Sequence, residues 1–255
     1  MIPKIIHQVW VGEYDIPDKE KQMSENIKNN HPDYTYYLWT NQNMPSIPDN
    51  LKEMYDVMYS KSDFVYCADM IRLLVVYQYG GYYFDLDFEY LKNLNDDYRY
   101  YSSEFNGWTN IEWRTGVLYG HWGVGWQHCD YTFANNVFGF EKEHPLMKYI
   151  VENMAPGSPV ETTTPARIQL NYGNCPYSPG WFGIVVKSFL GLENECSKEI
   201  WEYHKIIREL LLKYGIEYGH YNGFENKIFK HHAHYSWSLE NKAKLVEAHK
   251  NKNKE

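Results

Sequence analysis

The chain has 255 residues, of which 44% are hydrophobic, and it carries a net charge of −8 at neutral pH. A chain of this length and apolar content can form one large hydrophobic core, so we expect a single domain. No block of Lys and Arg occurs before the short C-terminal tail, and the phosphate backbone of a nucleic acid would meet an acidic surface. Nucleic acid is therefore excluded as an expected partner.

Cysteine spacing and hydropathy exclude two further classes. The four cysteines lie far apart and form no CxxC pair, which argues against a zinc knuckle and predicts reduced thiols. The first apolar run, residues 5–11, is interrupted by His7 and Gln8, and no segment is long enough for a signal sequence or a membrane span. We expect a soluble, cytoplasmic protein, for which peripheral membrane contact is compatible with the sequence.

In chain order, the pattern of apolar residues predicts alternating strands and helices as far as residue 91. Gly80 and Gly81 end the last of these helices in the manner of a C-terminal cap. This order favours a mainly parallel α/β sheet, whose ligand crevices lie at the carboxyl ends of the strands. The predicted strands are 4–12, 34–40 and 80–90, and the predicted helices are 18–30, 50–60 and 64–79.

The pattern beyond residue 91 is less regular. Trp- and Gly-rich loops are expected over 107–126, a strand over 137–140, and helices over 145–154 and 197–214. There are no internal repeats and no clear linker, so one domain over 1–255 is expected. Aromatic residues make up 18% of the chain, and their flat faces with polar edges suit sugars and nucleobases.

The segment GGYYFDLDFEY, residues 80–90, places two aspartates one residue apart in a strongly aromatic run. In a continuous strand Asp85 and Asp87 would point to the same face, together with Tyr83. One interpretation is an ordinary half-exposed strand whose polar face meets water. The other is a site for Mg²⁺ or Mn²⁺, because carboxylate oxygens at this spacing can hold such an ion and leave positions open for phosphate oxygens.

The preceding helix contains only two charged residues, Asp69 and Arg72. They could form a simple i,i+3 ion pair, but a lone pair in an otherwise apolar helix is costly to bury. Hydrogen bonding to a polar ligand explains them better, and they lie one helix before Asp85 and Asp87.

Two further segments are ambiguous on their residues alone. HHAHYSWS, residues 231–238, could supply a third metal ligand or could be a surface or core histidine cluster, since it has no fixed metal spacing. Trp10, at the end of the first strand, could stack on a nucleobase or could simply fill the core.

Together, IPKIIHQVWVG (2–12), ADMIRLLVVYQYGGYYFDLDFEYLKNL (68–94) and HHAHYSWS (231–238) resemble glycosyltransferase family 32, and NNVFGFEKEHP (135–145) adds to the likeness. The large glucosylating toxins are more distantly similar. The resemblance implies an α/β fold of the GT-A type, with one Rossmann-like nucleotide-binding sheet and an acceptor-side subregion. Residues 1–94 would form the nucleotide-sugar half, 95–226 the acceptor half, and 227–255 the closing motif and basic tail.

The family resemblance also implies a retaining transfer of a hexose from a nucleotide sugar, of the GDP-mannose or the UDP-galactose or UDP-glucose type, to a glycan or another hydroxyl acceptor. A divalent cation, usually Mn²⁺ and otherwise Mg²⁺, would bridge the protein and the diphosphate. Asp87 would ligate it directly, Asp85 would contact ribose, sugar or metal-bound water, and His232 or His231 would complete the shell.

Other residues would hold the rest of the donor. By resemblance, Asp69 and Arg72 would bind hydroxyls of the donor sugar, and Asn135 would lie near the donor sugar or the acceptor. The remaining donor contacts are implied for Tyr83 and Trp10, at the ribose and base, and for Ser236 and Trp237, over the diphosphate.

Two departures from the family pattern affect these assignments. Ala68 stands where the family commonly has Ser, and His234 adds an imidazole to the closing motif, which leaves the metal-binding histidine open. Two other functions use similar residues: a metal-dependent nucleotidyltransferase or phosphohydrolase, and a sugar-binding module that holds Ca²⁺. The 16-residue step from Asp69 to Asp85 is shared with the transferase family and disfavours both.

Overall fold

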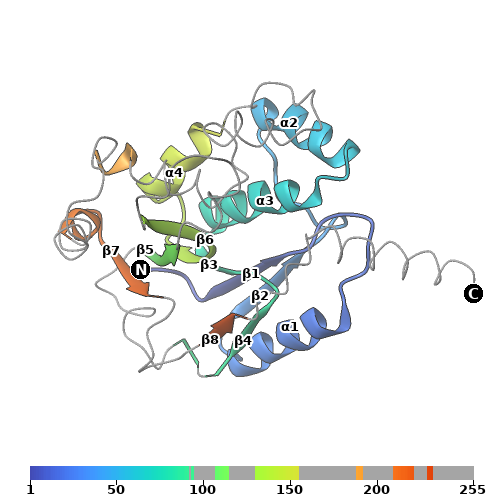
Figure 1. The fold of residues 1–255 in the computed structure, drawn as a ribbon, viewed down its shortest axis with the longest axis horizontal. Coiled ribbons are helices and arrows are strands. Elements are labelled where there is room, and N and C mark those ends of the chain that lie inside the picture. The colour runs from blue at the N-terminus through green and yellow to red at the C-terminus, as the bar shows by residue number, and fades with distance from the viewer. Residues whose placement is uncertain are drawn as a thin grey trace, which may run out of the picture.

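A computed structural model describes residues 1–91, 93–94, 107–114, 130–154, 188–191, 209–220 and 229–231. Within these residues the chain alternates strands and helices around one large sheet (Figure 1). No helix among them is long and apolar enough to cross a membrane. The helices are α1 (Asp18–Asn30), α2 (Asp49–Ser60), α3 (Phe64–Tyr79) and α4 (Pro145–Glu152). The strands are β1 (Ile5–Val9), β2 (Thr35–Trp39), β3 (Gly81–Phe84), β4 (Phe88–Tyr90), β5 (Gly107–Arg114), β6 (Asp130–Phe140), β7 (Ile216–His220) and β8 (Phe229–His231).

The large sheet has six strands in the order β2-β1-β3-β6-β5-β7. β2, β1 and β3 run parallel, as expected of strands joined by helical crossovers. β6 is antiparallel to both β3 and β5, and β5 is parallel to β7. The prediction of a mainly parallel sheet is therefore wrong for the second half of the sheet, which is mixed. Strands from 1–94 and from 95–226 share this sheet, and the division into halves stays a prediction.

Helices cover both faces of the sheet. α3 and α4 lie on one face with α2 packed on α3, and α1 lies on the other (Figure 1). Side chains of β3 alternate between the two resulting cores: Tyr82 and Phe84 pack toward Ile27 of α1, whereas Tyr83 belongs to the core on the α3 side. The predicted alternation along β3 is confirmed for these three residues.

The segment 80–90 is not one strand. β3 ends at Phe84, and Asp85, Leu86 and Asp87 form a turn that leads into β4. β4 leaves the large sheet and pairs with β8 in a separate two-stranded sheet. The expectation that both aspartates lie inside a continuous strand is therefore wrong, because Asp is disfavoured in strands and favoured in turns. The two carboxylates instead lie directly after the carboxyl end of β3.

Most of the other predicted elements occur in the structure, with different bounds. The predicted strands 4–12 and 34–40 and all three predicted helices up to residue 79 are confirmed, with shorter strands than expected. Residues 107–114, expected in loops, form β5, and the strand predicted at 137–140 is the end of the longer β6. The first part of the helix predicted at 197–214 lies outside the described residues.

The turn between α3 and β3 depends on glycine at position 81. Gly81 has φ of +104°, and a Cβ there would lie 2.6 Å from the Ile5 carbonyl oxygen of the neighbouring strand. Any side chain would meet both backbone strain and a steric clash. This glycine therefore lets β3 start against β1 directly after α3.

We expect Gly81→Ala to lower the free energy of unfolding by about 3 kcal/mol, because strain and clash add. Gly191→Ala is the matched control: Gly191 has φ of +71° but no atom within 4 Å of its Cβ position. Strain alone there should cost about 1 kcal/mol. Urea denaturation of both variants measures the difference, and equal losses would show that the approach of Ile5 does not constrain position 81.

His7 is a fully buried histidine that joins three elements. Its Nε2 donates to the Gly80 carbonyl at 2.8 Å, and its Nδ1 accepts a hydrogen bond from the Trp39 indole at 3.0 Å. Both ring nitrogens are thus satisfied only in the neutral form. Burial lowers the pKa of His7 from 6.5 to about 4, and the bond to Gly80 partly opposes this shift.

The lowered pKa of His7 predicts a pH-dependent loss of stability. Below pH 6.5 the unfolded chain takes up a proton at His7 that the folded chain excludes, so unfolding becomes more favourable as the pH falls toward 4. Between pH 7 and pH 5 the wild type should lose about 2 kcal/mol more than a His7→Gln variant. Urea denaturation at both pH values tests this, and parallel losses would contradict the prediction.

Candidate functional site

A buried arginine on α3 joins the polar groups at the end of β3. Arg72 is 7% exposed, and its Nη2 lies 2.7 Å from Oδ1 of Asp69, one helical turn earlier. Its Nη1 lies 3.1 Å from Oδ1 of Asp85 and donates to the Asn135 carbonyl oxygen of β6 at 2.9 Å. The structure therefore brings together four of the residues predicted from the sequence: Asp69, Arg72, Asp85 and Asn135.

Tyr83 of β3 also belongs to this cluster. Its hydroxyl donates to Oδ1 of Asp85 at 2.6 Å, and its ring lies under the guanidinium of Arg72, with Cζ 4.8 Å from the ring centroid. A cation over an aromatic face is attracted to it, most strongly where water is excluded. Tyr83 is only 1% exposed, and its predicted contact with ribose stays a prediction.

Burial and charge act against each other at Asp69 and Arg72. Burial raises the pKa of the Asp69 carboxyl, and the guanidinium 2.7 Å away opposes that rise. At Arg72, burial lowers the pKa, but Asp69 and Asp85 more than offset this effect, and the pKa lies above its ordinary value. Arg72 therefore stays charged and holds two carboxylates from separate elements in place.

Asp85 is fixed through its backbone as well as its side chain. Its N–H donates to the Asn136 carbonyl at 2.9 Å, and its carbonyl accepts from Gln8 Nε2 at 3.2 Å. The Gln8 Oε1 atom accepts from the Tyr36 hydroxyl at 2.7 Å. Strands on both sides of β3 thus hold this turn, while the Asp85 side chain keeps 25% of its surface exposed. Sequence reasoning missed Gln8, although a buried amide in the apolar run IIHQVWV is a signal for such a role.

Asn135 and Arg72 each keep one donor available. Within the described residues, Asn135 Nδ2 and Arg72 Nε are buried and make no hydrogen bond. Buried donors normally have a partner, so unpaired ones need an explanation, for example a bound ligand. Both donors belong to the cluster around Asp85.

Trp10 lies on the same edge of the sheet. It follows β1 directly, its backbone N–H donates to the Trp39 carbonyl at 2.8 Å, and its indole Nε1 donates to the Tyr14 carbonyl at 2.8 Å. Since β1 and β3 are parallel, Trp10 and Asp85 both follow the carboxyl ends of neighbouring strands. The side chain is half-buried rather than part of the closed core.

The C-terminal motif is only partly described. The backbone of His231 pairs with Phe88 in the small sheet, directly after Asp87. This register places the start of HHAHYSWS beside the aspartate turn. His232, Ser236 and Trp237 lie outside the described residues. Among the described residues, no group of three or more His, Cys, Asp or Glu side chains could hold a metal ion, and the predicted metal shell stays a prediction.

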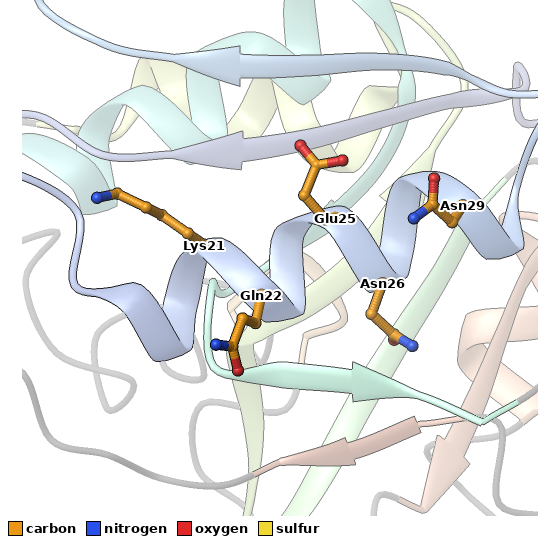
Figure 2. Close-up of a pocket in the computed structure, with 5 residues that line it drawn as sticks. All are labelled: Lys21, Gln22, Glu25, Asn26 and Asn29. Atoms are coloured by element: carbon orange, nitrogen blue, oxygen red, sulfur yellow. The ribbon is translucent and has the colours of Figure 1, made fainter.

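A depression elsewhere on the surface is separate from this cluster. It is lined by polar residues of α1: Lys21, Gln22, Glu25, Asn26 and Asn29. Figure 2 shows Gln22 and Asn26 on the side of α1 that faces β4, and the Asn26 side chain accepts from the Tyr90 N–H at 2.8 Å. Because α1 covers the opposite face of the sheet from α3, this depression is not part of the candidate site.

Part of the chain is similar in sequence to known glycosyltransferases. Residues 17–104 match the family described as the glycosyltransferase sugar-binding region containing the DXD motif. The chain is 30% identical over 154 residues to inositol phosphoceramide mannosyltransferase 3 of Schizosaccharomyces pombe. This alignment covers 60% of this chain and 37% of that protein. The chain is 38% identical over 91 residues to mannosyl phosphorylinositol ceramide synthase SUR1 of Saccharomyces cerevisiae, covering 34% of this chain and 23% of that one. The chain thus spans well under half the length of these two curated relatives.

A solved structure shares the fold. The PaToxG glycosyltransferase superposes with a TM-score of 0.54 at 16% sequence identity, over 84% of this chain and 78% of that one. At this identity the likeness shows the fold alone, and it confirms the predicted α/β fold of the GT-A type. Asp69, Arg72, Tyr83, Asp85 and Asp87 all lie within the matched family region. Residues 17–104 are therefore similar to the glycosyltransferase sugar-binding region that contains the DXD motif.

Proposed function

We propose that the chain is a metal-dependent, retaining glycosyltransferase that moves a hexose from a nucleotide sugar to a hydroxyl acceptor. The observation that carries this proposal is the buried cluster in which Arg72 joins Asp69 and Asp85 at the carboxyl end of β3. Ligands of open α/β sheets bind at such strand ends. A structural ion pair would need only one carboxylate. In this cluster the Asp85 side chain is partly exposed, and within the part of the chain that the structure describes Arg72 Nε and Asn135 Nδ2 are buried without a hydrogen bond.

The aspartate turn fits a divalent cation. Oδ1 of Asp85 lies 3.1 Å from Nη1 of Arg72 and accepts from the Tyr83 hydroxyl. By resemblance, direct coordination is assigned to Asp87, which is half-buried in the turn. Carboxylate oxygens are the ligands that Mn²⁺ and Mg²⁺ prefer. Such an ion would neutralise negative charge on the donor diphosphate.

In the proposed transfer, the bond between the anomeric carbon and the diphosphate oxygen breaks, and its electron pair stays on the nucleoside diphosphate. The acceptor oxygen bonds to the same face of the anomeric carbon, and its proton passes to the departing phosphate oxygen. Asp69 and Arg72 would hold the donor sugar through its hydroxyls. Fixed charges of this kind stabilise a transition state because they need no rearrangement when charge develops.

The remaining donor contacts follow from position. Trp10 offers a half-buried indole at the end of β1, where the nucleotide base would lie against it. Asn135 Nδ2 would donate to the donor sugar or to the acceptor. Closing residues Ser236 and Trp237 and the ligand His232 or His231 are proposed by resemblance.

Mannose is the first sugar to test. Two relatives are named as a mannosyltransferase acting on inositol phosphoceramide and as a mannosyl phosphorylinositol ceramide synthase, and these names favour GDP-mannose over UDP-galactose and UDP-glucose. Inositol phosphoceramide is, for the same reason, the first acceptor to test.

We expect Mn²⁺-dependent release of nucleoside diphosphate from one donor in a panel of GDP- and UDP-sugars. Asp87→Asn should lower this release at least about 100-fold, because the cation is lost and the negative charge on the diphosphate is no longer neutralised. Asp56→Asn is the matched control: Asp56 is exposed on α2, pairs with Lys52 and should leave turnover unchanged.

Two results would contradict the proposed function. Unchanged turnover in Asp87→Asn would remove that residue from the reaction. Cleavage of the donor to a nucleoside monophosphate and a sugar phosphate would indicate a phosphohydrolase instead.

Arg72→Lys should reduce kcat by about 100-fold. A lysine keeps the charge, but a single ammonium cannot hold Asp69, Asp85 and the Asn135 carbonyl in the same geometry, and small misplacements at a reacting centre are costly. Steady-state kinetics with the best donor measures the effect, and the thermal unfolding transition checks that the variant is folded. A folded Arg72→Lys variant with wild-type kcat would show that only the charge matters.

A further inference from the structure

Asn41, in the loop after β2, binds the loop after β1 at two points. Its Oδ1 accepts from the Gly12 N–H at 3.1 Å, and its Nδ2 donates to the Gly12 carbonyl at 2.7 Å. The same Nδ2 also donates to the Tyr59 hydroxyl of α2 at 2.8 Å. An exposed side chain that binds both polar groups of one distant residue restricts that residue far more than a single hydrogen bond would.

Gly12 lies in the short loop that fixes the Trp10 indole. The indole Nε1 donates to the Tyr14 carbonyl, so the ring direction depends on how the chain turns between residues 10 and 14. The turn needs an unusual backbone, because Gly12 has φ of +129°. Asn41 therefore holds the centre of the segment whose two ends are joined by the indole hydrogen bond.

The same loop presses against the start of α3. A Cβ on Gly12 would lie 2.7 Å from Cγ of Phe64, the first residue of that helix, and the Tyr14 and Phe64 rings meet edge to face at 5.9 Å. Phe64 also contacts Tyr59, with ring centroids 5.2 Å apart. The loop thus packs against the start of α3, and the Asn41 side chain joins Gly12 to the Tyr59 hydroxyl of α2 by hydrogen bonds.

We propose that Asn41 is a positioning residue that sets the affinity for the nucleotide donor by fixing the loop 10–14, and with it the Trp10 indole. This inference rests on the proposed function, in which the nucleotide base lies against Trp10. Within the described residues, Asn41 makes no hydrogen bond to Asp69, Arg72 or Asp85. It should therefore affect donor binding and leave the chemical step nearly unchanged.

We expect Asn41→Ala to raise KM for the donor, and Kd for the nucleoside diphosphate with Mn²⁺, by about 3- to 10-fold, the range for losing one or two exposed hydrogen bonds. kcat should stay within about twofold, since the substitution weakens binding of the ground state and of the transition state equally. Steady-state kinetics and isothermal titration calorimetry with GDP and UDP measure these quantities. Hydrogen–deuterium exchange should accelerate in the peptide that contains Gly12.

Asn153→Ala is the matched control, because Asn153 is an exposed asparagine at the end of α4 whose Nδ2 binds the Tyr149 carbonyl at 2.8 Å. It should change neither KM nor exchange at Gly12. If the wild type is active and Asn41→Ala has wild-type KM and Kd, or loses kcat instead, the positioning role is wrong while the proposed function stands. If the wild type neither binds nor turns over any donor, the proposed function fails and this inference fails with it.

Discussion

The buried guanidinium of Arg72 is the interaction on which the candidate site depends. It links a carboxylate of its own helix, a carboxylate after β3 and a backbone carbonyl of β6. Removing such a charge from water is costly, and only several well-placed partners compensate for it. The position of α3 over β3 and β6 is therefore tied to the position of Asp85, so the packing of the core and the geometry of the site are set together.

The sheet explains why this cluster lies where a ligand can reach it. β1 and β3 are parallel neighbours, and Trp10 and Asp85 follow their carboxyl ends. The antiparallel β6 brings Asn135 against the same end of β3, where Val137 pairs with Phe84. Glycine at position 81 allows β3 to begin directly after α3, so the helix that carries Asp69 and Arg72 lies across the strand that leads to Asp85.

From the sequence, the residues of the cluster could be predicted more accurately than the path of the backbone around them. Asp69 and Arg72 were identifiable because they are the only charges in an apolar helix, and the structure buries both beside Asp85. The path of residues 85–90 was not predictable from periodicity, because Phe88 and Tyr90 keep the strand spacing although β4 pairs with β8 rather than continuing β3. β6 was expected only at 137–140, since its pairing with β5 depends on contacts distant in sequence. Gln8 and Asn41 act through backbone groups of distant loops. Gln8 stands out as an amide in an apolar run, but no local pattern identifies the distant group that either side chain binds.

The most direct test of this account is a crystal structure with Mn²⁺ and the nucleoside diphosphate of the preferred donor, in which anomalous scattering locates the cation. The account predicts a manganese peak within bonding distance of the Asp87 carboxylate, with Arg72 still paired to Asp69 and Asp85 and the base against Trp10. A peak away from the turn 85–87, or a nucleotide bound elsewhere on the sheet, would contradict the central claim that this strand end is the donor site.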